Sequence, residues 1–121
     1  TDEEWKVLEG AVDSQYGIGN NTWDDYGYRG NDAGTNLKTT SGWYSNGNGT
    51  DSFGFSALPG GSHYDDGFYH VGDVGIWWTS TELGGCTAAW TRSLNCSFPR
   101  VGRIYDVEKG YGFSVRCLRD Y

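Results

Sequence analysis

Four short runs of β-branched and aromatic residues fill most of the second half of this 121-residue chain. Gly, Asn, Ser and Pro separate the runs, and these residues favour turns and strand ends. The 6 Trp, 9 Tyr and 5 Phe outnumber the 16 Ile, Leu and Val, so the core must be built around rings, which argues against a helical bundle. The expected strands are residues 75–81, 88–95, 101–107 and 112–118.

The run 88–95 predicts a sheet with two different faces, because side chains alternate along a strand. One face is expected to pack in the core, and the other is expected to be available at the surface. The available face carries Thr91, Ser93 and Asn95. Trp90, Arg92 and Leu94 are assigned to the core face.

One main helix is expected at residues 1–10. Thr1 followed by Glu4 is a capping box, and acidic residues 2–4 lie at the positive end of the helix dipole. Trp5, Leu8 and Val12 form a narrow apolar stripe that suits packing on a sheet, and the helix should end at Gly10 or Asp13. Because the capping residue is also residue 1, we expect the domain to be a fragment of a larger protein.

Residues 14–50 have no sustained period and predict long structured loops, with a short helical turn at 33–40. Loops of this length need buried anchors. A short strand is expected at 53–58, ended by Pro59. The expected anchors of the loops are Trp23, Tyr26, Tyr28, Leu37 and Trp43.

Charge and motifs exclude several functions. The net charge is −7 with only three lysines and no basic tract, so nucleic acid is not an expected partner. No apolar run reaches the roughly 20 residues of a membrane helix, so membrane insertion is not expected. The chain lacks GxSxG, HExxH and phosphate-binding loops, and the adjacent pairs Asp65–Asp66 and Asp24–Asp25 point apart on an extended chain, so no enzyme activity is expected.

Three cysteines leave two alternatives open. Cys86 and Cys96 are ten residues apart and can pair across a hairpin if their Cα atoms come within about 7 Å. Free, partly exposed thiols are the other interpretation, and Cys117 has no assigned partner.

Five segments, read in order, carry a resemblance that covers nearly the whole chain. They are TDEEWKVLEG, GTNLKTTSGW, FGFSALPGG, WWTSTE and GFSVRCLRD. Together they resemble the Fibrobacter succinogenes major paralogous domain, which occurs in secreted and surface proteins of Bacteroidetes, their relatives and phages. The resemblance implies one α+β domain with the C-type lectin-like fold: an early helix, long loops and a twisted antiparallel sheet. It also implies an extracellular, cell-surface or phage-particle location.

The resemblance implies a variable surface as well. Several such domains are the variable proteins of diversity-generating retroelements, which randomise asparagine codons in the C-terminal half. Residues 61–111 fit this pattern, because residues of unrelated chemistry lie between constant framework segments such as WWTSTE and YGFSVRC. The implied function is a non-catalytic binding module that presents residues 63–111 to a macromolecular ligand, a protein or a glycan.

The expected surface mixes rings with short polar side chains, as antibody paratopes do. The alternatives are a structural spacer or adhesin stalk, and an oxidoreductase like the sulfatase-modifying factors of this fold. The oligomeric state stays open. The candidate ligand-binding residues are Tyr64, Asp65, Asp66, Phe68, Tyr69, His70, Asp73, Ile76, Leu83, Thr87, Thr91, Ser93, Asn95, Phe98, Ile104, Tyr105, Asp106 and Tyr111.

No cofactor is expected, with one alternative left open. C-type lectins use calcium, and calcium takes six to eight oxygen ligands. The sugar-selecting triplet of those lectins is missing, so a calcium ion would be structural. A zinc site at His63 and His70 is disfavoured, because only Asp65 and Asp66 could complete it. The oxygen ligands at hand for calcium are Asp24, Asp25, Asp32, Asn46, Asn48 and Asp51.

Overall fold

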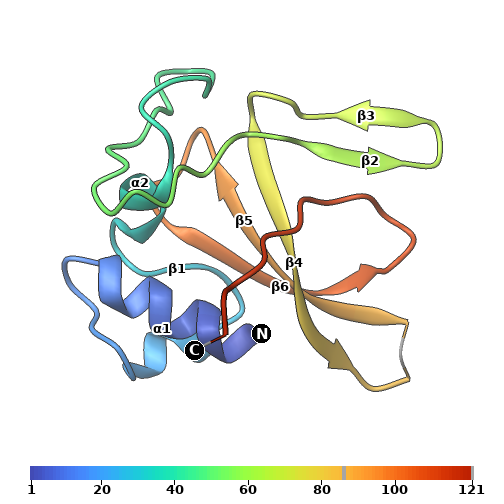
Figure 1. Ribbon diagram of the computed structural model, residues 1–121, viewed down its shortest axis with the longest axis horizontal. Coiled ribbons are helices and arrows are strands. Elements are labelled where there is room, and N and C mark those ends of the chain that lie inside the picture. Colours follow the sequence, from blue (N-terminus) through green and yellow to red (C-terminus); the bar gives the residue numbers. More distant parts are fainter. Residues whose placement is uncertain (86, 121) are drawn as a thin grey trace.

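The computed structural model describes residues 1–85 and 87–120, without the side chains of Asp106 and Val107, and shows an α+β chain with one main helix. A four-stranded antiparallel sheet has the order β1-β6-β5-β4, and a two-stranded hairpin lies beside it (Figure 1). The helices are α1 (Asp2–Val12), the 3-10 turn η1 (Asn21–Asp24) and α2 (Ala33–Leu37). The strands are β1 (Gly27–Arg29), β2 (Ser62–Tyr64), β3 (Gly67–Tyr69), β4 (Val74–Leu83), β5 (Ala88–Asn95) and β6 (Val101–Glu108).

Helix α1 begins and ends as its sequence predicts. The Thr1 hydroxyl accepts a hydrogen bond from the Glu4 amide, and the Glu4 side chain accepts one from the Thr1 backbone nitrogen. These two bonds complete the capping box. The helix ends at Asp13, one of the two predicted stops. Val12 is buried and Trp5 and Leu8 pack against the core, so the apolar stripe faces the sheet.

Three of the four predicted strands are confirmed as β4, β5 and β6, but residues 112–118 do not form a strand. This segment makes only isolated bridges, with His63 at Gly112 and with Trp77 at Ser114. It cannot form a continuous ladder, because it crosses from the hairpin to the edge of β4. The strand expected at 53–58 is wrong for another reason: Ser56 takes a positive φ of 56° and interrupts the extended chain.

The β2–β3 hairpin occupies a segment that the sequence predicts as a loop. Asp65 and Asp66 form its two-residue turn. Its base is held where Gly61 donates its amide hydrogen to Val74 O at 2.8 Å. Gly61 has φ +70°, and a Cβ there would overlap with the Tyr69 carbonyl oxygen, so the position requires glycine.

The sheet has an inner face that packs on α1 and an outer face that points away from it. Directly paired residues of an antiparallel sheet share a face, so the register defines both. The inner face carries Trp77, Arg92, Leu94, Val101 and Arg103, and the outer face carries Tyr28, Ile76, Thr91, Ser93, Gly102 and Ile104.

The core under α1 contains rings and aliphatic side chains, as expected. Trp23, Leu37 and Trp43 are buried there, so three of the predicted loop anchors serve that role, whereas Tyr28 is half-buried on the outer face. Tyr26 does not serve as an anchor, because its side chain is 53% exposed.

The same core contains a network of ion pairs, and the alternation along residues 88–95 predicted only one of its members, Arg92. Glu9 lies 2.6 Å from both Arg29 and Arg92, and Asp2 lies 2.7 Å from Arg92 and 2.9 Å from Arg103. Burial raises the pKa of Glu9, although both neighbouring arginines oppose this shift. Burial alone would also raise the pKa of Asp2, but Arg103 and Arg92 outweigh it and lower the pKa to about 2. We call these five residues the ionic cluster.

Candidate ligand-binding surface

The outer face of the sheet is covered in part by two segments from outside the sheet. One is the β2–β3 hairpin, and the other is residues 110–114, which run between the hairpin and the edge of β4 (Figure 1). His63 and Gly112 exchange backbone hydrogen bonds of 2.8 and 2.7 Å. Ser114 donates to Ile76 O at 2.9 Å and accepts from Trp78 N at 3.1 Å. These bonds fix Tyr64 and Tyr111 above the outer face.

A pocket of about 240 Å³ lies between the outer face and this covering. Its floor comes from the sheet, with Thr91 and Ser93 on β5 and the two isoleucines Ile76 and Ile104 on β4 and β6. Its walls are the rings of Tyr64, Tyr111 and Phe113.

Tyr111 contacts both other wall rings at steep angles. Tyr64 and Tyr111 have centroids 4.8 Å apart with an interplanar angle of 87°, and Tyr111 and Phe113 are 6.4 Å apart at 62°. Phe113 also packs on Trp78 of β4, with centroids 4.8 Å apart. The walls are therefore braced against the sheet as well as against each other.

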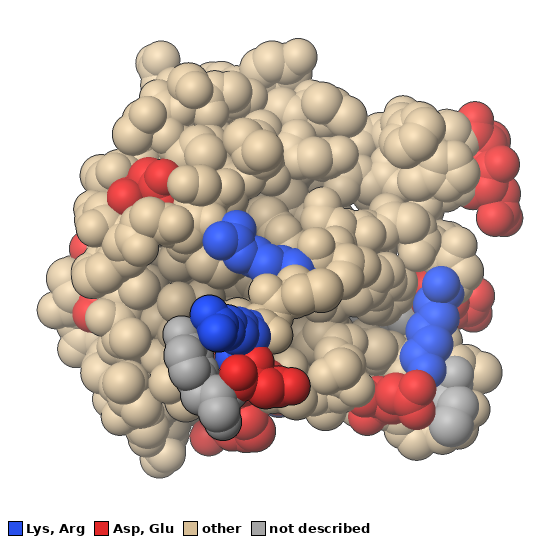
Figure 2. Space-filling model, in the orientation of Figure 1, with Lys and Arg blue, Asp and Glu red and all other residues tan. Residues whose placement is uncertain are grey.

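The hairpin extends this surface with exposed rings and acids. Phe68 is 76% exposed and packs against His63, and Tyr69 is 39% exposed and packs against Tyr64. A hydrogen bond to Asp66 raises the pKa of Tyr69. Figure 2 shows acidic side chains at the tip of the hairpin, where Asp65 and Asp66 form the turn.

The expectation that Thr91 and Ser93 are available to solvent is wrong. They alternate with Arg92 as predicted, but their exposed fractions are only 1% and 5%. The hairpin and residues 110–114 cover this face, and the sequence carries no sign of that covering. Asn95, at the end of β5, is half-buried.

Tyr105 does not join the candidate surface. Its ring packs on Tyr26 and Trp90, with centroids 4.9 and 5.0 Å apart, and Trp90 in turn lies 3.6 Å from the Arg103 guanidinium. Arg103 belongs to the inner face, so Tyr105 lies on the side of the sheet opposite the pocket. The prediction that Tyr105 extends the Thr91 face is therefore wrong.

Other predicted residues lie beside the surface or away from it. Leu83 and the exposed Thr87 flank the β4–β5 turn, at the end of that strand pair away from Asn95. His70 is exposed and Asp73 half-buried in the turn that leads into β4. Phe98 is 45% exposed and packs on Tyr28, with centroids 4.9 Å apart. The Asp106 side chain lies outside the described part of the chain.

Six of the seven pocket-lining residues are among the predicted site residues, and Phe113 is the one that the sequence analysis missed. It was assigned to a strand that does not exist. Gly102 was also missed: a Cβ there would overlap with the Ser93 hydroxyl, so the glycine leaves room for that oxygen. The signal for Gly102 was its position opposite Ser93, which appears only once the register is known.

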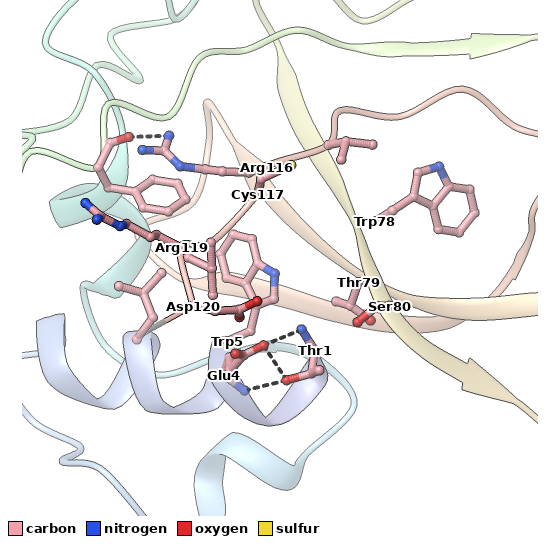
Figure 3. A pocket seen from close by; sticks show the side chains of 14 residues that line it. Thr1, Glu4, Trp5, Trp78, Thr79, Ser80, Arg116, Cys117, Arg119 and Asp120 are labelled. Carbon is pink, nitrogen blue, oxygen red and sulfur yellow. Dashed lines mark hydrogen bonds and ion pairs between the residues drawn. The ribbon is translucent and has the colours of Figure 1, made fainter.

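A larger cavity of about 720 Å³ lies between α1 and residues 115–120 (Figure 3). Two of its charged groups already have protein partners: Glu4 bonds Thr1, and Arg116 donates to Phe55 O at 2.6 Å and lies over the Phe55 ring. None of the predicted binding residues lines this cavity. The pocket on the outer face is therefore the better candidate site.

Oxygen atoms considered as calcium ligands brace the loops. The Asp51 carboxylate accepts from the Ser56 amide and hydroxyl, and Asn48 accepts from the Trp43 amide. Asp24 accepts from Lys6, and Asp32 from the Ser14 amide. Within residues 1–85 and 87–120, no three His, Cys, Asp or Glu side chains gather closely enough to hold a metal ion.

Cys96 and Cys117 are free thiols, and Cys86, whose pairing with Cys96 was one of the two alternatives, lies outside the described residues. The Cys96 thiol lies 3.9 Å from the Asp73 carboxylate and is half-buried. No helix in the described part of the chain has the length and apolar character needed to cross a membrane.

Comparison with known proteins gives one match. The model of the Fibrobacter succinogenes major domain matches residues 1–119. No curated protein and no solved structure matches the chain.

Proposed function

Since the chain belongs to the family of the Fibrobacter succinogenes major domain, we propose that it is a non-catalytic binding module with a C-type lectin-like fold. The module presents the hairpin and the outer-face pocket to a macromolecular ligand, a protein or a glycan, on a cell or host surface. The helix, the ionic cluster and the inner face serve as its rigid support.

One observation carries the proposal: exposed rings and short polar groups gather on one side of a braced sheet. Tyr111 is 37% exposed and lines the pocket floored by Thr91 and Ser93, and Phe68 and Tyr69 are 76% and 39% exposed on the hairpin beside it. Rings give large contact area at low entropic cost, and short polar side chains give adaptable hydrogen bonds. Aromatic residues are also enriched at protein interfaces.

We further propose that a diversity-generating retroelement varies positions within residues 63–111 that lie between the constant segments of this region. Such a region needs positions whose side chains can change without loss of the fold, and the exposed hairpin offers them. Sequencing around the gene tests this proposal. We expect a near-copy of this region, rich in asparagine codons, beside a reverse transcriptase gene, and a locus without either contradicts diversification.

The binding proposal is tested with a triple variant, Tyr64→Ala, Phe68→Ala and Tyr111→Ala. The labelled domain is screened on a glycan array and a phage-displayed peptide library. We expect a ligand that the triple variant no longer binds. The melting temperature should stay within a few degrees of the parent, because these rings are at least partly exposed.

Tyr105→Ala is the matched control, since it removes a partly exposed tyrosine from the opposite side of the sheet. It should bind like the parent protein. Equal binding by the triple variant, or the lack of any ligand on both screens, contradicts the proposal and favours a structural spacer. A fall of many degrees in melting temperature would show that the rings belong to the core.

A further inference from the structure

The outer-face pocket is too small for a whole glycan or a drug-sized molecule. Its volume is about 240 Å³, whereas pockets for such ligands range from roughly 300 to 1,000 Å³. A single side chain or a fragment of that size fits it. The pocket is thus a subsite of the larger surface, and its chemistry selects one group of the ligand.

Both hydroxyls on the pocket floor already donate their hydrogen atoms in hydrogen bonds to other groups of the protein. Thr91 Oγ1 donates to Ile104 O at 3.2 Å, and Ser93 Oγ donates to Tyr28 Oη at 3.3 Å. A hydroxyl has one hydrogen and two lone pairs, so each oxygen retains only accepting capacity. A group that enters the pocket and bonds to this floor must therefore be a hydrogen-bond donor.

The walls favour a donor that is also a cation. Ring faces carry partial negative charge and attract ammonium groups, and rings at steep mutual angles surround a cation better than they stack on a flat ligand. The angles between the wall rings are 87° and 62°. Among the described residues that line the pocket none is charged, so no basic side chain competes for the rings.

The surroundings of the pocket add attraction for positive charge. Asp65 and Asp66 are exposed at the tip of the hairpin that forms one wall. Ile76 and Ile104 offer an apolar lining for a methylene stem. A carboxylate or phosphate would find no donor on the floor of the pocket, and on its walls only the Tyr64 and Tyr111 hydroxyls could donate to it.

We infer that this pocket binds a primary ammonium group, the lysine side chain of a protein ligand. The inference rests on the proposed binding function and specifies the chemistry of its site. The lysine stem packs between Ile76 and Ile104, and its ammonium group donates to the Thr91 and Ser93 oxygens within the three rings. An ammonium group is compact and has three donors, so it can bond to these acceptors in several orientations.

The test is a titration with n-butylammonium, followed by the amide ¹H–¹⁵N NMR signals of the intact chain. We expect saturable shifts at Thr91, Ser93, Ile104 and Gly112. Neutral n-butanol and anionic butanoate, which have the same stem, should bind at least about tenfold more weakly. Equal binding of n-butanol would show a merely apolar pocket, and saturable binding of butanoate or of a methyl glucoside at these signals would likewise overturn the inference.

Thr91→Val and Ser93→Ala each remove one acceptor with little change in shape. Each variant should weaken n-butylammonium binding by about threefold or more. Phe53→Ala is the control, because Phe53 is 58% exposed and does not line the pocket, and it should bind like the parent. Unchanged binding by both acceptor variants would overturn the inference.

The outcome separates this inference from the proposed function. If the arrays yield a ligand that depends on the rings but n-butylammonium does not bind, the binding module stands and its lysine subsite is wrong. If n-butylammonium binds while the arrays yield no ligand, the cation site stands and the macromolecular function is wrong.

Discussion

The two faces of one sheet are built on different principles. The inner face joins α1 through the ionic cluster, in which Glu9 and Asp2 connect three arginines from β1, β5 and β6 at 2.6–2.9 Å. The outer face has short hydroxyls, two isoleucines and rings, and its covering is attached mainly by pairs of backbone hydrogen bonds at Gly112 and Ser114. Neighbouring residues on β5, such as Thr91 and Arg92, thus belong to different environments.

This difference shows how one strand can support a fixed scaffold and an adaptable surface together. Ion pairs are directional, and they hold helix and sheet in a single arrangement even where burial of the charges is costly. The outer side chains make few directional contacts, so their replacement should change the surface more than the fold. A mutation that affects both faces equally would contradict this view.

The largest expected effect comes from removing the acid at the centre of the ionic cluster. In Glu9→Ala, Arg29 and Arg92 remain buried without their shared carboxylate. Loss of one partner from a buried pair costs about 3–5 kcal/mol, and we expect a decrease of this size in the free energy of unfolding, measured by urea denaturation.

Glu3→Ala is the control for this prediction. Glu3 also forms an ion pair from α1, with Lys6 at 2.7 Å, but its side chain is 78% exposed. Exposed pairs contribute roughly 0–1 kcal/mol, so this variant should be nearly as stable as the parent. Similar losses in both variants would show that the buried cluster is not what fixes the inner face.

The second-largest effect is expected at acid pH, where protonation of Asp2 should weaken the ion pairs of the inner face. The arginines lower the pKa of Asp2 to about 2 from 3.8. A lowered pKa in the folded state gives stability that is present above the unfolded value and is lost as the pH falls through the folded value. Between about pH 5 and about pH 2, we therefore expect Asp2 to account for a loss of about 2 kcal/mol.

The measurement compares the parent with Asp2→Asn by urea denaturation across this pH range. The stability difference between the two proteins should shrink by that amount at the acid end, because the variant cannot be protonated at this position. A constant difference from about pH 5 to about pH 2 would contradict a charged Asp2 bound by Arg92 and Arg103.

Local signals explain which parts of this molecule could be predicted from its sequence. The capping box fixes the start of α1, and alternating β-branched and aromatic residues identify β4, β5 and β6. Each of these features depends on neighbours within a few residues of the chain. The alternation also assigned Arg92 to the core face, but its partners Glu9 and Asp2 lie more than 80 residues away.

The register of the strands, and the covering of the outer face by segments distant in the chain, could not be predicted. If the pairing of Ala89 with Val107 continued regularly, Thr91 would face Tyr105. A bulge between Ala89 and Thr91 shifts the partner of Thr91 to Ile104, and a shift of one residue moves Tyr105 to the other face. The burial of Thr91 and Ser93 depends on the hairpin at Ser62–Tyr69 and on residues 110–114, which lie well before and well after β5 in the chain.

The smallest expected effect is on the outer face, in Thr91→Val. Valine keeps the shape of threonine but cannot donate to Ile104 O, and a single neutral hydrogen bond contributes roughly 0.5–1.5 kcal/mol. Thr91 is as deeply buried as its neighbour Arg92. This variant therefore tests whether burial of a side chain or its ion pairs with other elements fix the sheet. Urea denaturation should show a loss of about 1 kcal/mol, several times less than for Glu9→Ala. A loss equal to that of Glu9→Ala would mean that the outer face is as much a part of the scaffold as the inner one, and that the pocket above it is not free to vary.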